Sequence, residues 1–135
     1  MANTIVITGA NRGIGLEMAR QWHARGERVI AVCRQASEAL KELGVEVIEG
    51  IDVARGEDIN RLAERLEGVR IDILYNNAGI LLDENLQDMN FATMEQQFEV
   101  NTLGPLNVTH ALLPNMGEGG KIGLMTSRMG SIADN

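Results

Sequence analysis

The sequence is short of the residues on which several classes of protein depend. Its 135 residues include one cysteine, one tryptophan, one tyrosine, two phenylalanines and two prolines. Because Cys33 is the only cysteine, an internal disulfide is excluded, and we expect a protein of the reducing cytoplasm in which this residue fills core space. The few aromatic residues provide no mixed basic and aromatic surface on which bases could stack.

Long apolar runs and an excess of positive charge are absent as well. The longest apolar stretches, such as Val29–Cys33, are far shorter than the ~20 residues that cross a bilayer. The segment Met1–Thr4 has no basic residues followed by a long apolar stretch, so we expect neither a membrane span nor a secretory signal. A formal net charge of −7 repels phosphate backbones, which argues against a nucleic-acid partner. Any bound phosphate must therefore be held by local groups.

What the sequence does have is an alternation of short β-branched runs with longer amphipathic segments. This order repeats several times and is typical of a parallel sheet flanked by crossover helices. Since no repeat, composition break or long linker interrupts it, we expect a single domain over residues 1–135. The expected strands are Thr4–Thr8, Arg28–Cys33, Val45–Ile48, Ile71–Tyr75 and Lys121–Thr126.

The spacing of apolar residues predicts four helices between these strands. The first covers Gly15–Arg25 and stops at Gly26, the second places Ala36, Ala39, Leu40 and Leu43 on one face before Gly44, the third lies between Gly56 and Gly68, and the fourth covers Phe91–Leu113. A kink or break is expected near Gly104 and Pro105, because proline cannot donate the helical hydrogen bond.

A glycine-rich turn lies between the first strand and the first helix. Residues Thr8–Gly15 read Thr-Gly-Ala-Asn-Arg-Gly-Ile-Gly, which places three glycines where a Rossmann domain contacts its dinucleotide. Glycine permits the tight turn and a close approach of the pyrophosphate, and the helix N-terminus offers N–H groups to an anion. Glycines that serve packing alone are the alternative. The strand before and the helix after the turn favour nucleotide binding.

The Thr-Gly-x-x-x-Gly-x-Gly form resembles the turn of the short-chain dehydrogenase/reductase family, and later segments extend the resemblance. Asp52-Val53 follows the third strand, and Asn76-Asn77-Ala78-Gly79 follows the fourth. The resemblance implies a Rossmann-type, doubly wound parallel sheet in three α/β/α layers. It also implies that Asp52 lies near the adenine and that the asparagine segment lines the cofactor and steadies the sheet. The alternatives are a turn or capping aspartate and an ordinary asparagine turn.

The residue after the second strand indicates which nicotinamide cofactor is bound. NAD-binding domains usually carry an acidic residue about 20 positions after the glycine turn, whereas here Arg34 follows Cys33. Arg34 and Arg12 would pair with the 2′-phosphate, so we predict NADP(H) over NAD(H). The alternative is a solvated arginine. The expected cofactor-binding residues are Thr8, Gly9, Asn11, Arg12, Gly13, Ile14, Gly15, Arg34, Asp52, Val53, Asn77, Ala78 and Gly79.

Two catalytic positions of the family match this sequence. Asn101 matches the helix asparagine that supports a relay through water and lysine, and Ser127, in a Ser-x-x-Gly segment, matches the serine that polarises the substrate carbonyl. Taken singly, either could be a residue of a helix break or a turn. The run Ser127–Asn135 further resembles sniffer-type carbonyl reductases and the bacterial C-factor-like group.

The Tyr-x-x-x-Lys pair of the family is absent from residues 1–135. Tyr75 is the only tyrosine, and Gly79 stands where its lysine would be. The family sheet has seven strands in the order 3-2-1-4-5-6-7, so this one would be truncated after its fifth strand. We therefore expect an open fifth strand, exposed Phe and Leu side chains on the fourth helix, and no catalysis by these 135 residues alone.

These observations support one leading hypothesis and two alternatives. The leading hypothesis is an NADP(H)-dependent oxidoreductase that reduces a small-molecule ketone or aldehyde and forms a homo-oligomer, a dimer or tetramer, when its full domain is present. The first alternative is a short, non-catalytic nucleotide-binding or interaction protein. The second is a nucleotide-dependent methyltransferase, against which the asparagine segment and Ser127 argue. His23 and His110 stand alone, so no metal site is expected.

Overall fold

The computed structural model of the chain describes residues 2–77, 92, 95 and 99–124. Five parallel strands form one sheet in the order β3-β2-β1-β4-β5. The strands are β1 (Thr4–Thr8), β2 (Arg28–Val32), β3 (Glu46–Ile48), β4 (Ile71–Asn76) and β5 (Met116–Leu124). This is the predicted Rossmann-type sheet, because the chain moves outward from β1 to β3 and then returns to the other side of β1.

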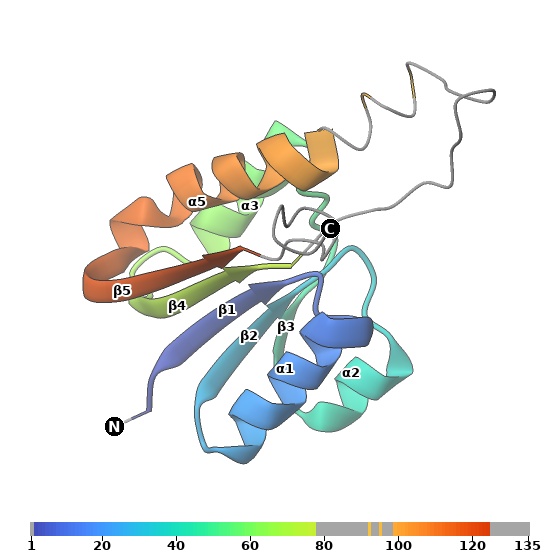
Figure 1. Ribbon diagram of the computed structural model, residues 1–135, viewed down its shortest axis with the longest axis vertical. Coiled ribbons are helices and arrows are strands. Elements are labelled where there is room, and N and C mark those ends of the chain that lie inside the picture. The colour runs from blue at the N-terminus through green and yellow to red at the C-terminus, as the bar shows by residue number, and fades with distance from the viewer. Residues whose placement is uncertain (1, 78–91, 93–94, 96–98, 125–135) are drawn as a thin grey trace, which may run out of the picture.

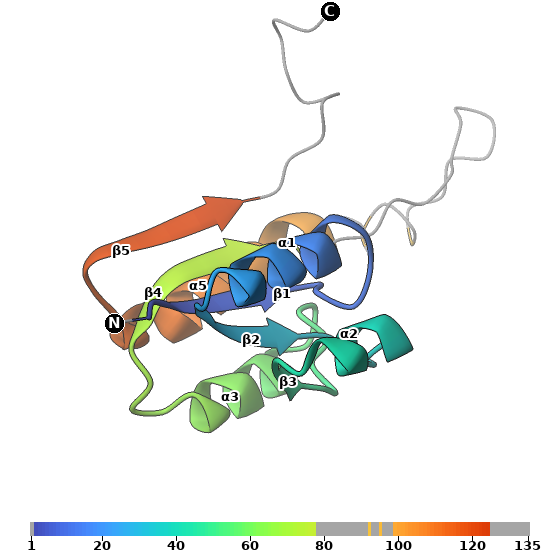
Figure 2. The ribbon, with the colours of Figure 1, turned by 90° about the horizontal axis from the view of Figure 1, so that it is seen from below.

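Helices cover both faces of this sheet. They are α1 (Gly13–Ala24), α2 (Glu38–Leu43), α3 (Gly56–Arg65) and α5 (Gly104–Leu112), with a π-helical turn at Glu99–Leu103 and a 3₁₀ turn at Leu113–Asn115. In Figure 1, α1 and α2 lie below the sheet and α3 and α5 lie above it. Because all neighbouring strands are parallel, their carboxyl ends lie at the same end of the sheet, as the arrowheads of β2, β4 and β5 show in Figure 2.

The core explains why the central strands read as continuous apolar runs. Ile5, Val6 and Ile7 of β1 are fully buried, because helices cover both faces of this strand. Val6 belongs to the core on the α3 and α5 side, which includes Leu112. Ile5 and Ile7 belong to the core on the α1 and α2 side, which includes Leu40.

Two predicted helices differ in detail from the observed ones. Helix α1 begins at Gly13, two residues before the predicted start, because Arg12 adopts an extended conformation and acts as the N-cap. Helix α2 begins only after Ser37, whose side chain caps it, so Ala36 lies before the helix rather than on its face. Gly26 and Gly44 follow these helices with φ of 83° and 78°, as expected for helix stops.

The expected break near Gly104 and Pro105 is confirmed. The π-helical turn ends at Leu103, and α5 begins at Gly104 with Pro105 in its first turn. Proline has no N–H to donate, and the wider π turn before it accommodates the interrupted hydrogen-bond ladder. The predicted start of this helix at Phe91 lies outside the described residues.

The predicted start of the last strand is wrong. Strand β5 begins at Met116 rather than Lys121, because Met116 already pairs with Ile71 of β4, before the regular pairing that starts at Lys121. Met116 lies opposite Ile71 and Lys121 opposite Ile73, so the extra residues are absorbed in an irregularity of the register. The predicted end at Thr126 lies outside the described residues.

Apolar side chains are exposed on α5, on the turn that follows it and on β5, the last strand in the sheet order. Among the described residues β5 pairs with β4 alone. Leu106 and Leu113 are 62% and 50% exposed, and Leu124 of β5 is 59% exposed. The leucine exposure expected from the sequence is therefore present, whereas both phenylalanines lie outside the described residues. None of the described helices is both long and apolar enough to cross a bilayer.

Candidate functional site

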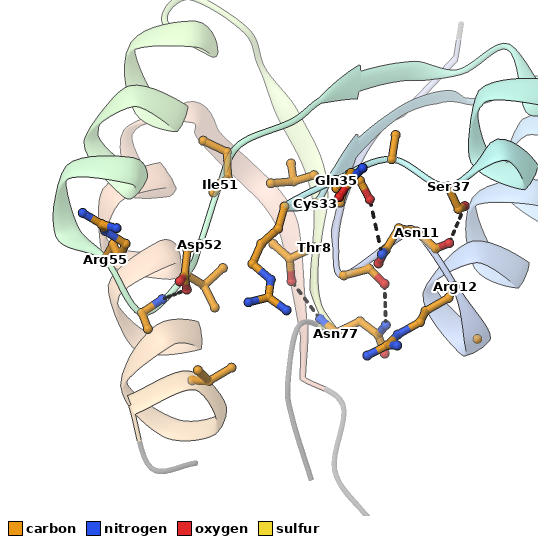
Figure 3. Close-up of a pocket in the computed structure, with 18 residues that line it drawn as sticks. Thr8, Asn11, Arg12, Cys33, Gln35, Ser37, Ile51, Asp52, Arg55 and Asn77 are labelled. Atoms are coloured by element: carbon orange, nitrogen blue, oxygen red, sulfur yellow. Dashed lines mark hydrogen bonds between the residues drawn. The ribbon is translucent and has the colours of Figure 1, made fainter. Parts of the chain in front are cut away.

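A cavity of about 1090 Å³ lies at the carboxyl ends of the strands, where α/β sheets place their ligands. Three segments form it: the glycine turn after β1, the segment after β2 and the segment after β3. Asn77, after β4, and Val100, in the π-helical turn, complete the lining. Figure 3 shows Arg12 and Asn77 at one side of this cavity and Asp52 and Arg55 at the other.

The glycine turn has the backbone geometry that only glycine adopts without strain. Gly9 and Gly13 have φ of 63° and 58°. Gly15 has no such angle, but a Cβ on this residue would lie 2.5 Å from Nδ2 of Asn77 and closer still to the carbonyl oxygen of Gly9. The first two glycines therefore shape the turn, and the third allows α1 to pack against it.

Asn77 ties the end of β4 to the end of β1. Its backbone N–H donates to Oγ1 of Thr8 at 3.0 Å, and its side-chain Nδ2 donates to the carbonyl oxygen of Gly9 at 3.2 Å. Both bonds appear in Figure 3. Asn77 thus fixes the turn and lines the cavity at the same time. Ala78 and Gly79, the rest of the predicted segment, lie outside the described residues.

The side chain of Asn76 points toward α5, in the helix layer opposite the one that contains α1 and α2. It is only 3% exposed, and its Nδ2 donates to Oγ1 of Thr109 in α5 at 3.1 Å. Its Oδ1 has no hydrogen-bond partner among the described residues. The two asparagines therefore steady the sheet in different ways, one toward the glycine turn and one toward α5.

The segment after β2 carries a buried thiol and an exposed cation. Cys33 is 4% exposed, and burial together with the nearby Glu49 carboxylate raises the pKa of its thiol. Arg34 is exposed and lines the cavity, as does Arg12 of the glycine turn. Neither arginine forms an ion pair within residues 2–77 and 99–124.

Asp52 forms a turn at the edge of the cavity. Its Oδ1 accepts a hydrogen bond from the N–H of Ala54 at 2.9 Å, and its own N–H donates to Oδ2 of Asp58 at 3.0 Å. Arg61 donates to Oδ1 of Asp58 and lowers the pKa of that carboxyl. The turn interpretation of Asp52 is therefore correct, and the residue also lines the cavity beside Val53.

The cavity is cationic although the chain carries a net charge of −7. Its lining includes Arg12, Arg34 and Arg55, against one carboxylate, Asp52. Arg55 is neutralised by Glu57, with Nη2 and Oε1 2.7 Å apart. The charges that remain in the lining are the two arginines that the sequence singled out and the carboxylate of Asp52, so the balance is positive and suited to an anion.

Most of the predicted cofactor-binding residues that the structure describes line this cavity, with two exceptions. Ile14 is 58% exposed and does not line the cavity, and Gly15 is buried behind the turn. Asn101 is exposed in the π-helical turn, next to Val100, which lines the cavity. Ser127 lies outside the described residues.

Several lining residues were not expected from the sequence. They are Val32, Cys33, Gln35, Ala36, Ser37, Ile51, Ala54, Arg55 and Val100. Of these residues, only Ser37 could have been singled out from the sequence, because a serine directly before a helical segment is a common N-cap. The hydrogen bond of Ser37 to Asn11 in the glycine turn joins distant parts of the chain, so the local sequence does not predict it.

The fold and this cavity define a dinucleotide-binding domain of the Rossmann type. Comparison with known proteins identifies the family. The model of the short chain dehydrogenase family matches residues 3–134, so the chain belongs to this family of oxidoreductases. A curated relative, 1-hydroxy-2-glutathionyl-2-methyl-3-butene dehydrogenase of Rhodococcus sp. (strain AD45), is 38% identical over 98% of the chain.

Solved structures show the same fold. A putative short-chain dehydrogenase/reductase from Burkholderia multivorans with bound NADP matches 100% of the chain with a TM-score of 0.91 and 31% identity. A carbonyl reductase from Pseudomonas aeruginosa PAO1 in complex with NADP matches 98% with the same TM-score and identity. The chain spans 60% of the length of the Rhodococcus enzyme and 63% and 62% of these two structures.

Proposed function

We propose that the complete protein is an NADP(H)-dependent carbonyl reductase that transfers hydride to a ketone or aldehyde. The observation that carries this proposal is that Arg12 and Arg34, which form no ion pair in the part of the chain that the structure describes, lie on the wall of a cavity at the carboxyl ends of the strands. A guanidinium binds a phosphate through two charge-assisted hydrogen bonds. The NADP complex of the Pseudomonas carbonyl reductase supports the same assignment.

The residues of the cavity fit such a cofactor. Gly9 and Gly13 leave bare backbone at the turn, and the cavity lies beside the N-terminus of α1, which favours the pyrophosphate. Arg12 and Arg34 would hold the 2′-phosphate, and Asp52 would lie near the adenine. The bound cofactor would supply the hydride, while the protein would bind and orient the substrate and would protonate its carbonyl oxygen.

The catalytic groups are proposed from the family resemblance. The Ser127 hydroxyl would hold the carbonyl oxygen, and Asn101 would support the proton relay. The proton donor of the family is the tyrosine of a Tyr-x-x-x-Lys pair, which residues 1–135 do not contain. We therefore propose that a polypeptide of these residues alone binds the cofactor but does not reduce carbonyls.

Cofactor titration of the complete gene product tests this function. We expect NADPH to bind at least about tenfold more tightly than NADH, and Arg34→Ala to remove most of this preference, because each charge-assisted bond contributes about 1.5–3 kcal/mol. Calorimetry would measure both dissociation constants. The matched control is Arg65→Ala, which removes an exposed arginine on α3 outside the cavity. Equal affinity for NADPH and NADH would contradict the proposal.

Turnover separates an enzyme from a binding protein. We expect the complete gene product to oxidise NADPH in the presence of ketones or aldehydes. Tight NADPH binding without turnover across a broad carbonyl panel would support the non-catalytic alternative instead.

We also propose that the complete protein is a homo-oligomer, either a dimer or a tetramer. Two exposed leucines, Leu106 of α5 and Leu113 of the 3₁₀ turn that follows it, motivate this assignment, because exposed apolar patches mark association surfaces. Light scattering after size exclusion would measure the molar mass, and a monomer at micromolar concentration would contradict it.

A further inference from the structure

Two hydrogen bonds join the glycine turn to the segment after β2. The Ser37 hydroxyl donates to the carbonyl oxygen of Asn11 at 2.5 Å, and Nδ2 of Asn11 donates to the carbonyl oxygen of Gln35 at 3.4 Å. Figure 3 shows both bonds beside the cavity. We call these three residues the Ser37 clamp. It connects segments that lie 24 to 26 residues apart in the sequence.

Ser37 is itself held in a defined orientation. Its Oγ also accepts a hydrogen bond from the N–H of Leu40 at 3.2 Å, so the hydroxyl both donates and accepts. The residue is half-buried and extended, with φ of −76° and ψ of 162°. A hydroxyl that donates once and accepts once at fixed partners has little rotational freedom. The clamp is therefore anchored on the first turn of α2.

The segment after β2 is fixed from its other side by the end of β3. The N–H of Gly50 donates to the carbonyl oxygen of Arg34 at 2.9 Å, and the N–H of Ala36 donates to Oε2 of Glu49 at 3.2 Å. Neither bond reaches the glycine turn. The glycine turn is also joined to the end of β2 itself, where the N–H of Ala10 donates to the carbonyl oxygen of Val32 at 3.5 Å. The clamp adds the side-chain link between the turn and the segment after β2, next to the two arginines.

The residues of the clamp are direct chain neighbours of those arginines. Asn11 precedes Arg12, and Gln35 follows Arg34. A change in the clamp therefore changes the distance between the backbone of Arg12 and that of Arg34, and with it the separation of their guanidinium groups. A phosphate that must meet both cations depends on this separation, since binding to a preorganised pair avoids the cost of ordering it.

We propose that Ser37 is a positioning residue that selects the 2′-phosphorylated cofactor by holding Arg12 and Arg34 at a fixed separation. The proposal rests on the proposed NADP(H) function and deepens it. NADH has no 2′-phosphate, so its binding depends on the glycine turn and not on the spacing of the arginines. Ser37 acts on the ratio of the two affinities rather than on nucleotide binding as such.

The test compares Ser37→Ala with Ser37→Thr in the complete gene product. Calorimetry measures the dissociation constants of NADPH and NADH for each variant. Ser37→Ala removes two hydrogen bonds, the one to Asn11 that forms the clamp and the one from Leu40 that caps α2. Because the bond to Asn11 sets the turn against the segment after β2, we expect NADPH affinity to fall about five- to tenfold and NADH affinity to change by less than about twofold. Ser37→Thr keeps the hydroxyl and is expected to restore the ratio. A general structural defect would weaken both cofactors equally.

Two further variants separate the clamp from helix capping and from stability. Ser37→Gly keeps a residue that is tolerated at an N-cap but removes the hydroxyl, so it is expected to behave like Ser37→Ala even if the latter folds poorly. Asn115→Ala removes two side-chain bonds, to the carbonyl oxygens of Leu66 and Val69, away from the cavity. It is expected to lower thermal stability without changing the cofactor ratio.

The outcomes distinguish this inference from the function on which it rests. A wild-type preference for NADPH that persists unchanged in Ser37→Ala and Ser37→Gly would overturn the role of Ser37 alone. A wild-type protein without any NADPH preference would overturn the proposed function, and the inference with it. A ratio that falls in both variants and returns in Ser37→Thr would establish the positioning role.

Discussion

Gly15 shows how a missing side chain determines the position of a helix. The residue is buried, and a Cβ would meet the carbonyl oxygen of Gly9 and Nδ2 of Asn77. We expect Gly15→Ala to push α1 away from the turn, which would destabilise the protein by about 1–3 kcal/mol and weaken NADPH binding about tenfold or more. Denaturant unfolding and cofactor titration would measure the two effects.

The matched control for this substitution is Gly56→Ala at the start of α3. A Cβ on Gly56 meets nothing within 4 Å, and its φ is not positive. This variant is expected to be neutral or slightly stabilising, because alanine loses less backbone entropy on folding than glycine does. If Gly15→Ala were as stable and bound NADPH as tightly as Gly56→Ala, close packing of the turn would not be the reason for Gly15.

Single residues were predictable where their role follows from backbone chemistry or charge. The glycine turn and Arg34 could be placed at the cavity from the sequence, because a tight turn of this kind requires glycine and because the residue after a parallel strand lies at the carboxyl edge of the sheet. Ile14 was included only because it lies within the motif, and its side chain is exposed outside the cavity. Ser37 could not be identified as a partner of Asn11, because their hydrogen bond spans 26 residues.

At the scale of elements, Asn76 and Thr109 attach α5 to β4. Their hydrogen bond is 3.1 Å long, and Asn76 is buried with its Oδ1 unpartnered among the described residues. We expect Thr109→Val to destabilise the protein by about 1–3 kcal/mol, because it also leaves the buried Nδ2 of Asn76 without its partner. Equilibrium unfolding in urea would measure the loss.

A double-mutant cycle shows whether this loss arises from the pair. Once Asn76 is replaced by alanine, Thr109→Val no longer strands a buried donor, so its additional cost is expected to fall to a few tenths of a kcal/mol. Additive effects of Asn76→Ala and Thr109→Val would show that the two side chains stabilise the protein independently. The link between β4 and α5 would then lie elsewhere.

Elements were predictable to the extent that burial produces a simple pattern. Strand β1 is covered on both faces and reads as a continuous apolar run, so its observed bounds, Thr4–Thr8, equal the predicted ones. Strand β5 is exposed along most of its length and begins with a glycine-rich segment that resembles a loop. Its pairing with β4 is a tertiary fact, and the register irregularity near Met116 hides it from periodicity.

At the scale of the whole molecule, charge and fold act in opposite directions on an anionic ligand. The chain carries a net charge of −7, which would repel the proposed cofactor at long range, whereas Arg12 and Arg34, without an ion pair among the described residues, would attract it at the cavity. Long-range repulsion acts on NADH and NADPH alike through the charges that they share. The proposed attraction of the arginines for the 2′-phosphate would act on NADPH alone, and both arginines are exposed to solvent.

Salt is therefore expected to reduce the preference for NADPH. Exposed ion pairs weaken as the Debye length falls from about 30 Å at 0.01 M to about 3 Å at 1 M salt. We expect the ratio of NADH to NADPH dissociation constants to fall about threefold or more between 20 mM and 500 mM NaCl. In Arg34→Ala the ratio should be low and nearly independent of salt. A ratio that is constant in the wild type would show that shape, rather than the charge of the arginines, selects the cofactor.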